Sequence, residues 1–180
     1  MDSFERRAIV ASGQAASRMR VESSMKLDSV STHPGFAAGR LGPLHLSIWD
    51  TRSTPEQAAR AIEVLEGLGR EEERVLVLAV LGANTPPPDD AVRDLFAAGF
   101  GRLGKRVVAV GNVIEGQGFR AATMRAVVTG LTLVIRAPHP QRTFATIEEG
   151  ARFIAEQSEG RLTTDQVRRV AIELRVRATA

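Results

Sequence analysis

Two segments made almost entirely of apolar residues constrain the fold of this 180-residue chain more than any other feature. They are VLVLAVL (75–81) and RVVAVGNVI (106–114), and both are rich in β-branched side chains. Continuous apolar strands are typical of a parallel sheet that is covered on both faces, since a strand with one wet face alternates with polar residues. Parallel strands need long crossovers, which are usually helices. The two segments therefore predict an α/β fold.

The segment before the first buried strand carries the signals of a helix. Thr54 as the N-cap and Gln57 three positions later predict a capping box, with Pro55 at the first helical position. An apolar stripe at helical spacing is formed by Ala58, Ala61, Ile62, Leu65 and Leu68. Gly69 is expected to act as the C-terminal cap. The sequence predicts that this helix follows its strand directly.

Two further helices are indicated between 89 and 136. Asp89 and Asp90 place negative charge in a first turn, where the helix dipole favours it. The apolar stripe behind them is Val92, Leu95, Phe96, Phe100 and Leu103, before Gly104. A third stripe contains Met124, Val127, Val128, Leu131 and Ile135. Because this stripe keeps its phase across Gly130, we expect one helix there, with a strand over 131–136 as the alternative.

The two ends of the chain supply the remaining elements. Segments 24–31 and 42–50 alternate and predict two strands joined as a hairpin. A short last strand over 142–146 precedes a second capping box, Thr146 with Glu149. A C-terminal helix from Thr163 has a stripe of Val167, Val170, Ala171 and Leu174, to be buried against the domain or a second copy. The predicted order is β-β-α-β-α-β-α-β-α plus a C-terminal helix, on a mixed, mostly parallel sheet of about five strands.

Composition excludes several classes of site. Cysteine is absent, so the chain forms no disulfide and no thiolate metal site. The net charge is only +3, there is no Tyr, and there is one Trp, so we do not expect a nucleic-acid partner. No run of about 18 apolar residues predicts a membrane span. Charged residues interrupt the first twenty positions, so we expect no signal peptide and a cytoplasmic location.

The segment VIEGQGFRAATM (113–124) contains a loose dinucleotide fingerprint, Gly116-x-Gly118-x-x-Ala121. A true fingerprint lies on the first βα unit and is followed about 20 residues later by an acidic residue for the ribose. Here the turn follows a late strand, and 132–136 contains no carboxylate. Gly116 and Gly118 are therefore interpreted as a structural turn. Weak anion binding at the helix N-terminus is the one cofactor-type role left to them, and we expect no cofactor.

Catalytic and metal sites are not predicted. His33 and His139 each adjoin a proline, and His45 lies in a strand, without the spacing of a zinc site. The sequence contains no Gly-x-Ser-x-Gly nucleophile elbow. Asp50, Asp89 and Asp90 lie at element ends, where capping and charge–dipole effects explain them. We therefore expect a protein that is not an enzyme.

The stretch from about 25 to 156 resembles the STAS domain (sulfate transporter and anti-sigma-factor antagonist) in its stand-alone bacterial form. The resemblance lies in STPEQAARAIEVLEGL, in RVLVLAVLG, in IEGQGFRAATMRAVVTGLTLV and in the closing RTFATIEEGARFIAEQ. It implies a STAS-like α/β domain over 23–158, between an N-terminal extension (1–22) and a C-terminal helical tail (159–180).

The resemblance also implies a function. STAS antagonists are non-enzymatic signalling modules that bind a regulatory kinase or anti-sigma-like protein, and they are switched by phosphorylation of an Asp-Ser-Ser-Gly-like turn after the third strand. At that junction this chain has GANTPPPDD, where Thr85 is the available hydroxyl and Asp89 and Asp90 already supply negative charge. We expect Thr85, the possible regulatory residue, to be an ordinary turn residue because added phosphate would be repelled.

Two functions remain open. The first is a regulatory protein-binding module without the usual serine phospho-switch, which could also self-associate into a homo-oligomer. The alternative is a carrier or sensor domain for a small ligand, a nucleotide or a lipid, bound at the glycine turn or in an apolar cleft.

Overall fold

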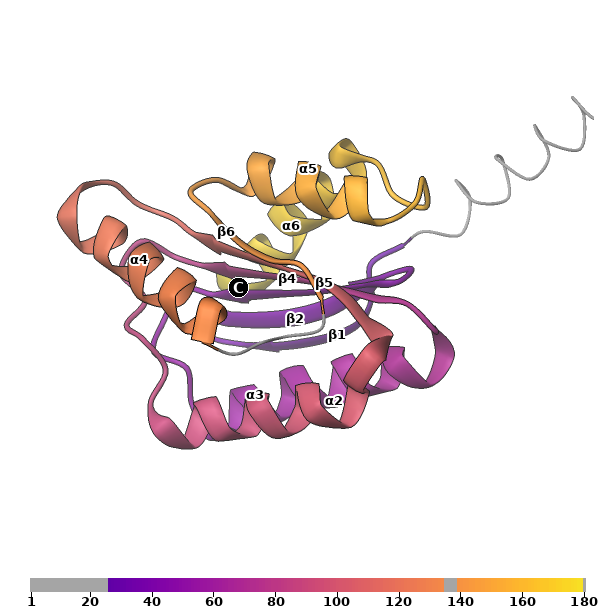
Figure 1. The fold of residues 1–180 in the computed structure, drawn as a ribbon, viewed down its shortest axis with the longest axis horizontal. Coiled ribbons are helices and arrows are strands. Elements are labelled where there is room, and N and C mark those ends of the chain that lie inside the picture. The colour runs from indigo at the N-terminus through magenta and orange to yellow at the C-terminus, as the bar shows by residue number, and fades with distance from the viewer. Residues whose placement is uncertain (1–25, 135–138, 180) are drawn as a thin grey trace, which may run out of the picture.

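The computed structural model describes residues 26–134 and 139–179, and they form an α/β layer structure around one six-stranded sheet (Figure 1). The strands lie side by side in the order of the sequence. They are β1 (Asp28–His33), β2 (Phe36–Leu41), β3 (Leu44–Trp49), β4 (Val75–Leu81), β5 (Val107–Ile114) and β6 (Gln141–Phe144). Strands β1 to β3 pair antiparallel, and β3 to β6 pair parallel. The predicted α/β class with a mixed, mostly parallel sheet is confirmed.

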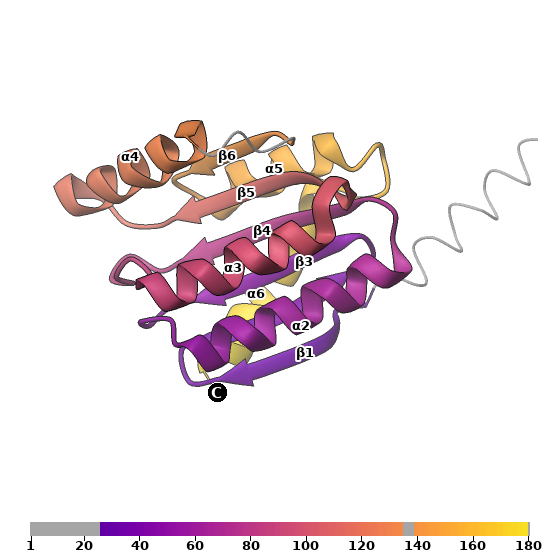
Figure 2. The same ribbon diagram turned by 60° about the horizontal axis from the view of Figure 1, so that its bottom comes forward.

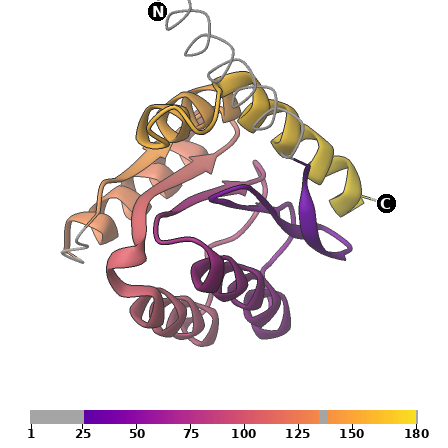
Figure 3. The ribbon, with the colours of Figure 1, turned by 90° about the vertical axis from the view of Figure 1, so that its right-hand side faces the viewer.

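Helices cover both faces of this sheet (Figure 3). On one face, α2 (Pro55–Glu71) and α3 (Asp90–Leu103) pack against β4 and β5, and the short helix η1 (Gly104–Arg106) follows α3. On the other face, α5 (Ile147–Gln157) and α6 (Thr164–Thr179) cover the larger apolar core. Helix α4 (Gly118–Val134) lies beside the β6 edge (Figure 2). The buried side chains of β4 therefore face a helical layer on each side, as continuous apolar strands require.

Strand β2 is the element that the sequence analysis missed. The predicted hairpin of 24–31 with 42–50 is wrong, because β2 lies between β1 and β3 and pairs antiparallel with each of them. A turn at Pro34 and Gly35 joins β1 to β2, and a second tight turn at Gly42 and Pro43 leads to β3. The predicted second strand, 42–50, is therefore the third. The β2 sequence, FAAGRL, has small residues and no alternation, so its strand character comes from pairing with β1 and β3 on both sides. The predicted first strand begins outside the described residues, and β1 itself runs later, from Asp28 to His33.

The start of α2 is as predicted, but its end is not. Thr54 accepts a hydrogen bond from the Gln57 backbone, and the Gln57 side chain accepts one from the Thr54 backbone. Gly69 was predicted to cap the helix, yet α2 continues to Glu71. A Cβ at position 69 would collide with the Leu103 side chain of α3. The glycine therefore allows the two helices to approach closely, a role that helix-capping rules do not reveal.

The other helices largely follow the sequence signals. Asp89 caps α3 by accepting from the Val92 amide, and Gly104 ends it. Helix α4 continues across Gly130 to Val134, so the predicted continuous helix is confirmed that far. The positions that follow in 135–138 lie outside the described residues, as does the N-terminal extension, 1–22. Thr146 and Glu149 form the predicted capping box of α5.

The C-terminal helix α6 packs on the domain itself. Its predicted stripe is buried in the same core as β2 and β3, with Ala171 and Leu174 fully covered. At its end, the Ala178 carbonyl accepts a hydrogen bond of 2.9 Å from the Gly35 amide, in the β1–β2 turn (Figure 3). We expected this stripe to be buried either against the domain or against a second copy, and in the structure it packs on the domain's own sheet.

Screening the described helices for length and hydropathy identifies none that could cross a membrane.

The buried His45 makes folding stability depend on pH. His45 lies in β3, 3% exposed, and burial lowers its pKa from 6.5 to about 4. Between these values the unfolded chain binds a proton that the folded chain does not, so stability falls as pH drops from 6.5 towards 4. We expect the protonation of this residue to lower the free energy of unfolding by roughly 2 to 3 kcal/mol between pH 7 and pH 4.5. Urea unfolding at both pH values should show a smaller loss for His45→Leu than for the parent. A matched control, His33→Asn, should keep the parental loss, and equal losses in all three proteins would contradict the assignment.

Candidate functional site

The carboxyl ends of the parallel strands meet at one edge of the sheet, where open α/β sheets generally bind their ligands. The arrowheads of β4 and β5 point to this edge in Figure 2. The strand ends are joined by backbone hydrogen bonds: the Gly82 amide donates to Trp49 O at 2.8 Å, and the Glu115 amide donates to Leu81 O at 3.0 Å. The loops after β3, β4 and β5 are thus fixed to one another. We call this region the carboxyl edge.

The glycine turn lies at the carboxyl edge between β5 and α4. Gly116 has φ +102° and Gly118 has φ +82°, a region that L-residues rarely occupy. A Cβ at Gly116 would also lie 2.9 Å from the Ala83 Cβ, whereas a Cβ at Gly118 would meet nothing within 4 Å. Gly116 is therefore needed for its positive φ and because a larger side chain would collide with Ala83. Gly118 is needed for its positive φ alone. Both needs are structural, which is how the sequence analysis interpreted the turn.

An ion-pair cluster adjoins the turn. The Arg175 guanidinium on α6 donates from Nη1 to Glu115 Oε1 at 2.9 Å, and its Nη2 lies 2.8 Å from Glu115 Oε2. Its Nε lies 3.6 Å from Asp50 Oδ2. Neither Nη2 nor Nε has a well-directed hydrogen bond, so these two contacts are attractions between charges. Burial lowers the pKa of Arg175, but the Glu115 hydrogen bond and the charges of Glu115 and Asp50 outweigh it and raise the pKa above its ordinary value.

Sequence reasoning missed this cluster. Asp50 and Glu115 each follow a strand, which indicates that their side chains meet at the carboxyl edge. Asp50 was explained as an element-end residue, and Arg175 was not singled out. No sequence signal connects Arg175 to positions 60 and 125 residues earlier, because the contact exists only once α6 docks on the sheet.

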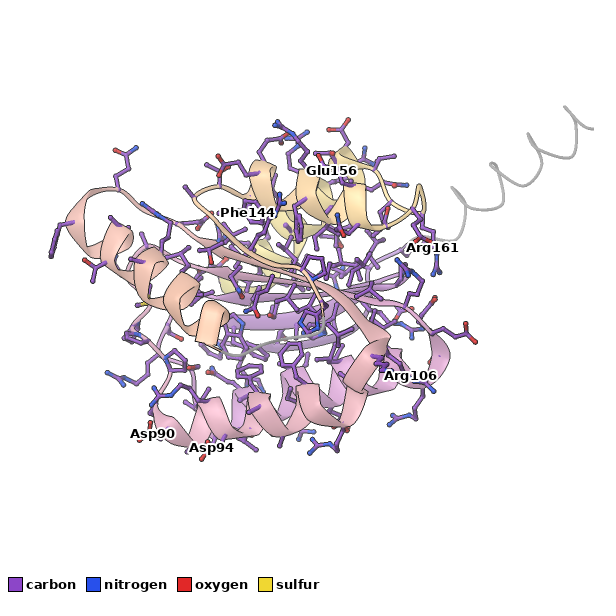
Figure 4. The ribbon with its side chains drawn as sticks, viewed as in Figure 1. Asp90, Asp94, Arg106, Phe144, Glu156 and Arg161 are labelled. Carbon is purple, nitrogen blue, oxygen red and sulfur yellow. The ribbon has the colours of Figure 1, made fainter. Side chains whose placement is uncertain are left out.

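Thr85, the possible regulatory residue that we expected to be an ordinary turn residue, is turned inwards. Its side chain is 6% exposed, and its hydroxyl donates a hydrogen bond of 2.6 Å to Trp49 O. Asp89 caps α3, and Asp90 pairs with Arg93 within the first turn of the same helix. Figure 4 shows Asp90 at the carboxyl-edge end of the molecule, opposite the end that carries Arg106 and Arg161. The structure thus places all three predicted residues at the carboxyl edge and gives each a structural partner.

Phe119 is the most exposed large apolar residue of the described chain, at 88%. It lies in the first turn of α4, directly after Gly118. The exposed side of α4 continues from it through Ala122, Thr123 and Ala126, all uncharged. The chain has few aromatic residues, and this one is almost fully exposed to solvent. Aromatic residues are enriched in protein interfaces.

Two grooves of the surface lie away from the glycine turn. One of 270 Å³ is lined by Arg40, Val64, Gly67 and Leu68 among others, and one of 210 Å³ by Ala59, Ile62, Leu95 and Arg102 among others. Both run along α2 and are smaller than typical pockets for organic ligands. Within the described ranges, no three His, Asp or Glu side chains are placed to hold a metal ion.

No protein-family model, no curated protein and no solved structure matches this chain.

The two turn glycines should differ in their tolerance of a side chain. We expect Gly118→Ala to cost about 1 kcal/mol of folding stability, because only backbone strain opposes it. Gly116→Ala should cost at least about 1 kcal/mol more, since its Cβ also presses on Ala83. Gly101→Ala on α3, which has open space and no positive φ, serves as the control and should be neutral or stabilising. Denaturant midpoints measure all three. A Gly118→Ala protein as stable as the Gly101→Ala protein would show that the turn carries no strain.

Thr85 should tolerate loss of its hydroxyl better than gain of charge. We expect Thr85→Val to cost about 1 kcal/mol, since Trp49 O keeps its bond from Gly82. Thr85→Glu should cost several times more, because it buries a carboxylate without a partner. The same change at the exposed Thr123 is the control and should be nearly neutral. A Thr85→Glu protein that is as stable as Thr123→Glu, together with phosphate on Thr85 by intact mass, would restore the phospho-switch.

Proposed function

We propose that this chain is a non-enzymatic regulatory module that binds a protein partner through the carboxyl edge, in the manner of the STAS antagonists it resembles, and without their serine phospho-switch. The observation that carries the proposal is the 88% exposure of Phe119 in the first turn of α4, directly after the glycine turn. Interfaces concentrate their binding energy in a few aromatic or arginine anchors, and Phe119 is an aromatic side chain left exposed by the described part of the chain.

The position of Phe119 agrees with the resemblance. The resemblance equates the antagonists' regulatory turn with the junction 82–90, which follows β4, the fourth strand once β2 is counted, and borders the glycine turn. The two segments touch where Gly116 meets Ala83. A partner that approached this junction would therefore meet Phe119 as well. The inward hydroxyl of Thr85 supports a module that binds without being switched at that residue.

The small-ligand alternative has less support. The two grooves along α2 are open and partly charged, and neither is lined by the glycine turn. Anion binding at the N-terminus of α4 would place the ligand beside Glu115, whose carboxylate repels an anion. Calorimetric titration of the parent with NAD and ATP should accordingly show no binding, and a thermal-shift screen against lipids should leave the midpoint unchanged.

The proposal is tested by capturing partners on immobilised protein. We expect the parent to retain a specific protein from cells of its own host, and Phe119→Ala to lose it, because truncating a central aromatic anchor commonly costs more than about 2 kcal/mol, or some 30-fold in affinity. Ile172→Ala removes another exposed apolar side chain, 50% exposed on α6, and should retain the partner. Equal retention by both variants would rule out Phe119 as the anchor. Micromolar binding of a nucleotide or lipid by the parent would favour the carrier function.

A further inference from the structure

Arg175 connects α6 to the strand ends that border the glycine turn. Its guanidinium pairs with both Asp50, directly after β3, and Glu115, directly after β5. The contact with Glu115 combines one hydrogen bond from Nη1 with a charge contact at Nη2, so two nitrogens of one guanidinium lie against the two carboxylate oxygens. The side chain is 29% exposed, so solvent screens this contact less than it screens a pair on the open surface.

The residue that Arg175 holds is the first residue of the turn. After Glu115, the chain passes through Gly116 and Gly118, whose backbone freedom would allow many conformations. Arg125 limits this freedom from the α4 side, donating from Nη1 to Ile114 O at 2.9 Å and to Gly116 O at 3.3 Å. Arg175 limits it from the α6 side. Two arginines from two helices thus hold a segment that glycine alone would leave loose.

The charges explain why the arginine matters. Asp50 and Glu115 both lie against one guanidinium, so removing it would leave two partly buried carboxylates without the cation that both contact. Their like charges repel, and the segment after Glu115 has the freedom to rearrange, because Gly116 and Gly118 lie in it.

We propose that Arg175 is a positioning residue, which orders the turn at 115–119 from α6 and thereby determines how Phe119 is presented to a partner. This inference deepens the proposed function and rests on it. It makes α6 a regulatory element of the carboxyl edge: any event that draws the last turns of α6 from the sheet also releases the turn that carries the anchor.

The order of the turn can be measured without a partner. Because the chain has no cysteine, Gln117→Cys introduces a single thiol, on an exposed residue of the turn, for a nitroxide spin label. We expect an immobilised spectrum in the otherwise parental protein and loss of the immobilised component in Arg175→Met. Arg175→Lys should keep part of it. Arg177→Met is the matched control, since Arg177 pairs with Glu173 on the exposed side of the same helix, and it should keep all of it.

A second label distinguishes local order from general loosening. Ala98→Cys places the nitroxide on the exposed side of α3, and its spectrum should be the same in every variant. Glu115→Ala removes both acceptor oxygens of the same contact, so it should mobilise the label at 117, and combining it with Arg175→Met should add little. If Arg175→Met does not fold, Glu115→Ala carries the measurement. An unchanged spectrum at 117 in these variants, or equal changes at 117 and 98, would overturn the positioning role.

The partner assay keeps the two proposals separate. Loss of the partner by Phe119→Ala, with no change of the label at 117 in Arg175→Met, would leave the proposed function standing and end this inference. A label released by Arg175→Met in a protein that retains no partner would contradict the proposed function and leave this inference standing, since Arg175 would still order the turn.

Discussion

The central strand β4 must be buried on both faces, and the other layers follow from that requirement. Its side chains alternate between the core beneath α5 and α6, where Leu76, Leu78 and Val80 lie, and the core beneath α2 and α3, where Val75 and Val77 lie. Because no face of this strand tolerates water, each crossover has to supply a helix, and the C-terminal helix has to complete the cover over β2 and β3. Parallel pairing from β3 to β6 then brings the loops after these strands to one edge.

Two carboxylates lie at the carboxyl edge, and α6 supplies the positive charge that offsets them. The ends of β3 and β5, on either side of β4, carry Asp50 and Glu115, whose like charges repel. The helix that covers the core brings Arg175 against both carboxylates, and its positive charge offsets that repulsion. Core coverage and carboxyl-edge order therefore depend on the same helix, and this dependence is what couples the packing to the proposed function.

The resemblance to STAS antagonists and the geometry point to the same edge for different reasons. The resemblance suggests it through the position of a regulatory turn, and the geometry through an exposed aromatic residue on a restrained segment. They part at Thr85. A hydroxyl that already donates to Trp49 O from a buried position is a poor substrate for a kinase, so the proposed regulation is better sought in the contacts that hold the glycine turn than at Thr85.

Local patterns in the sequence were sufficient for most of the fold. Apolar runs identified β4 and β5, capping boxes identified the starts of α2 and α5, and an unbroken stripe identified α4, because each signal arises within a few residues of chain. The α/β class followed from them. Strand β2 was missed because FAAGRL has no strand preference of its own and is a strand only through its neighbours on both sides.

The residues of the candidate site also differ in whether the sequence alone could reveal their roles. Gly116 and Gly118 could be interpreted from sequence, since a positive φ is a property of one residue's backbone. Gly69 could not, because its role is defined by the Leu103 side chain of another helix. The cluster of Asp50, Glu115 and Arg175 could not either, since its members are far apart in the chain and meet only after α6 has docked. The sequence by itself determined which segments had to be buried. Only the tertiary structure decided which charges and which exposed aromatic residue came to share an edge, because those contacts are set by packing across the sheet and not by neighbours along the chain.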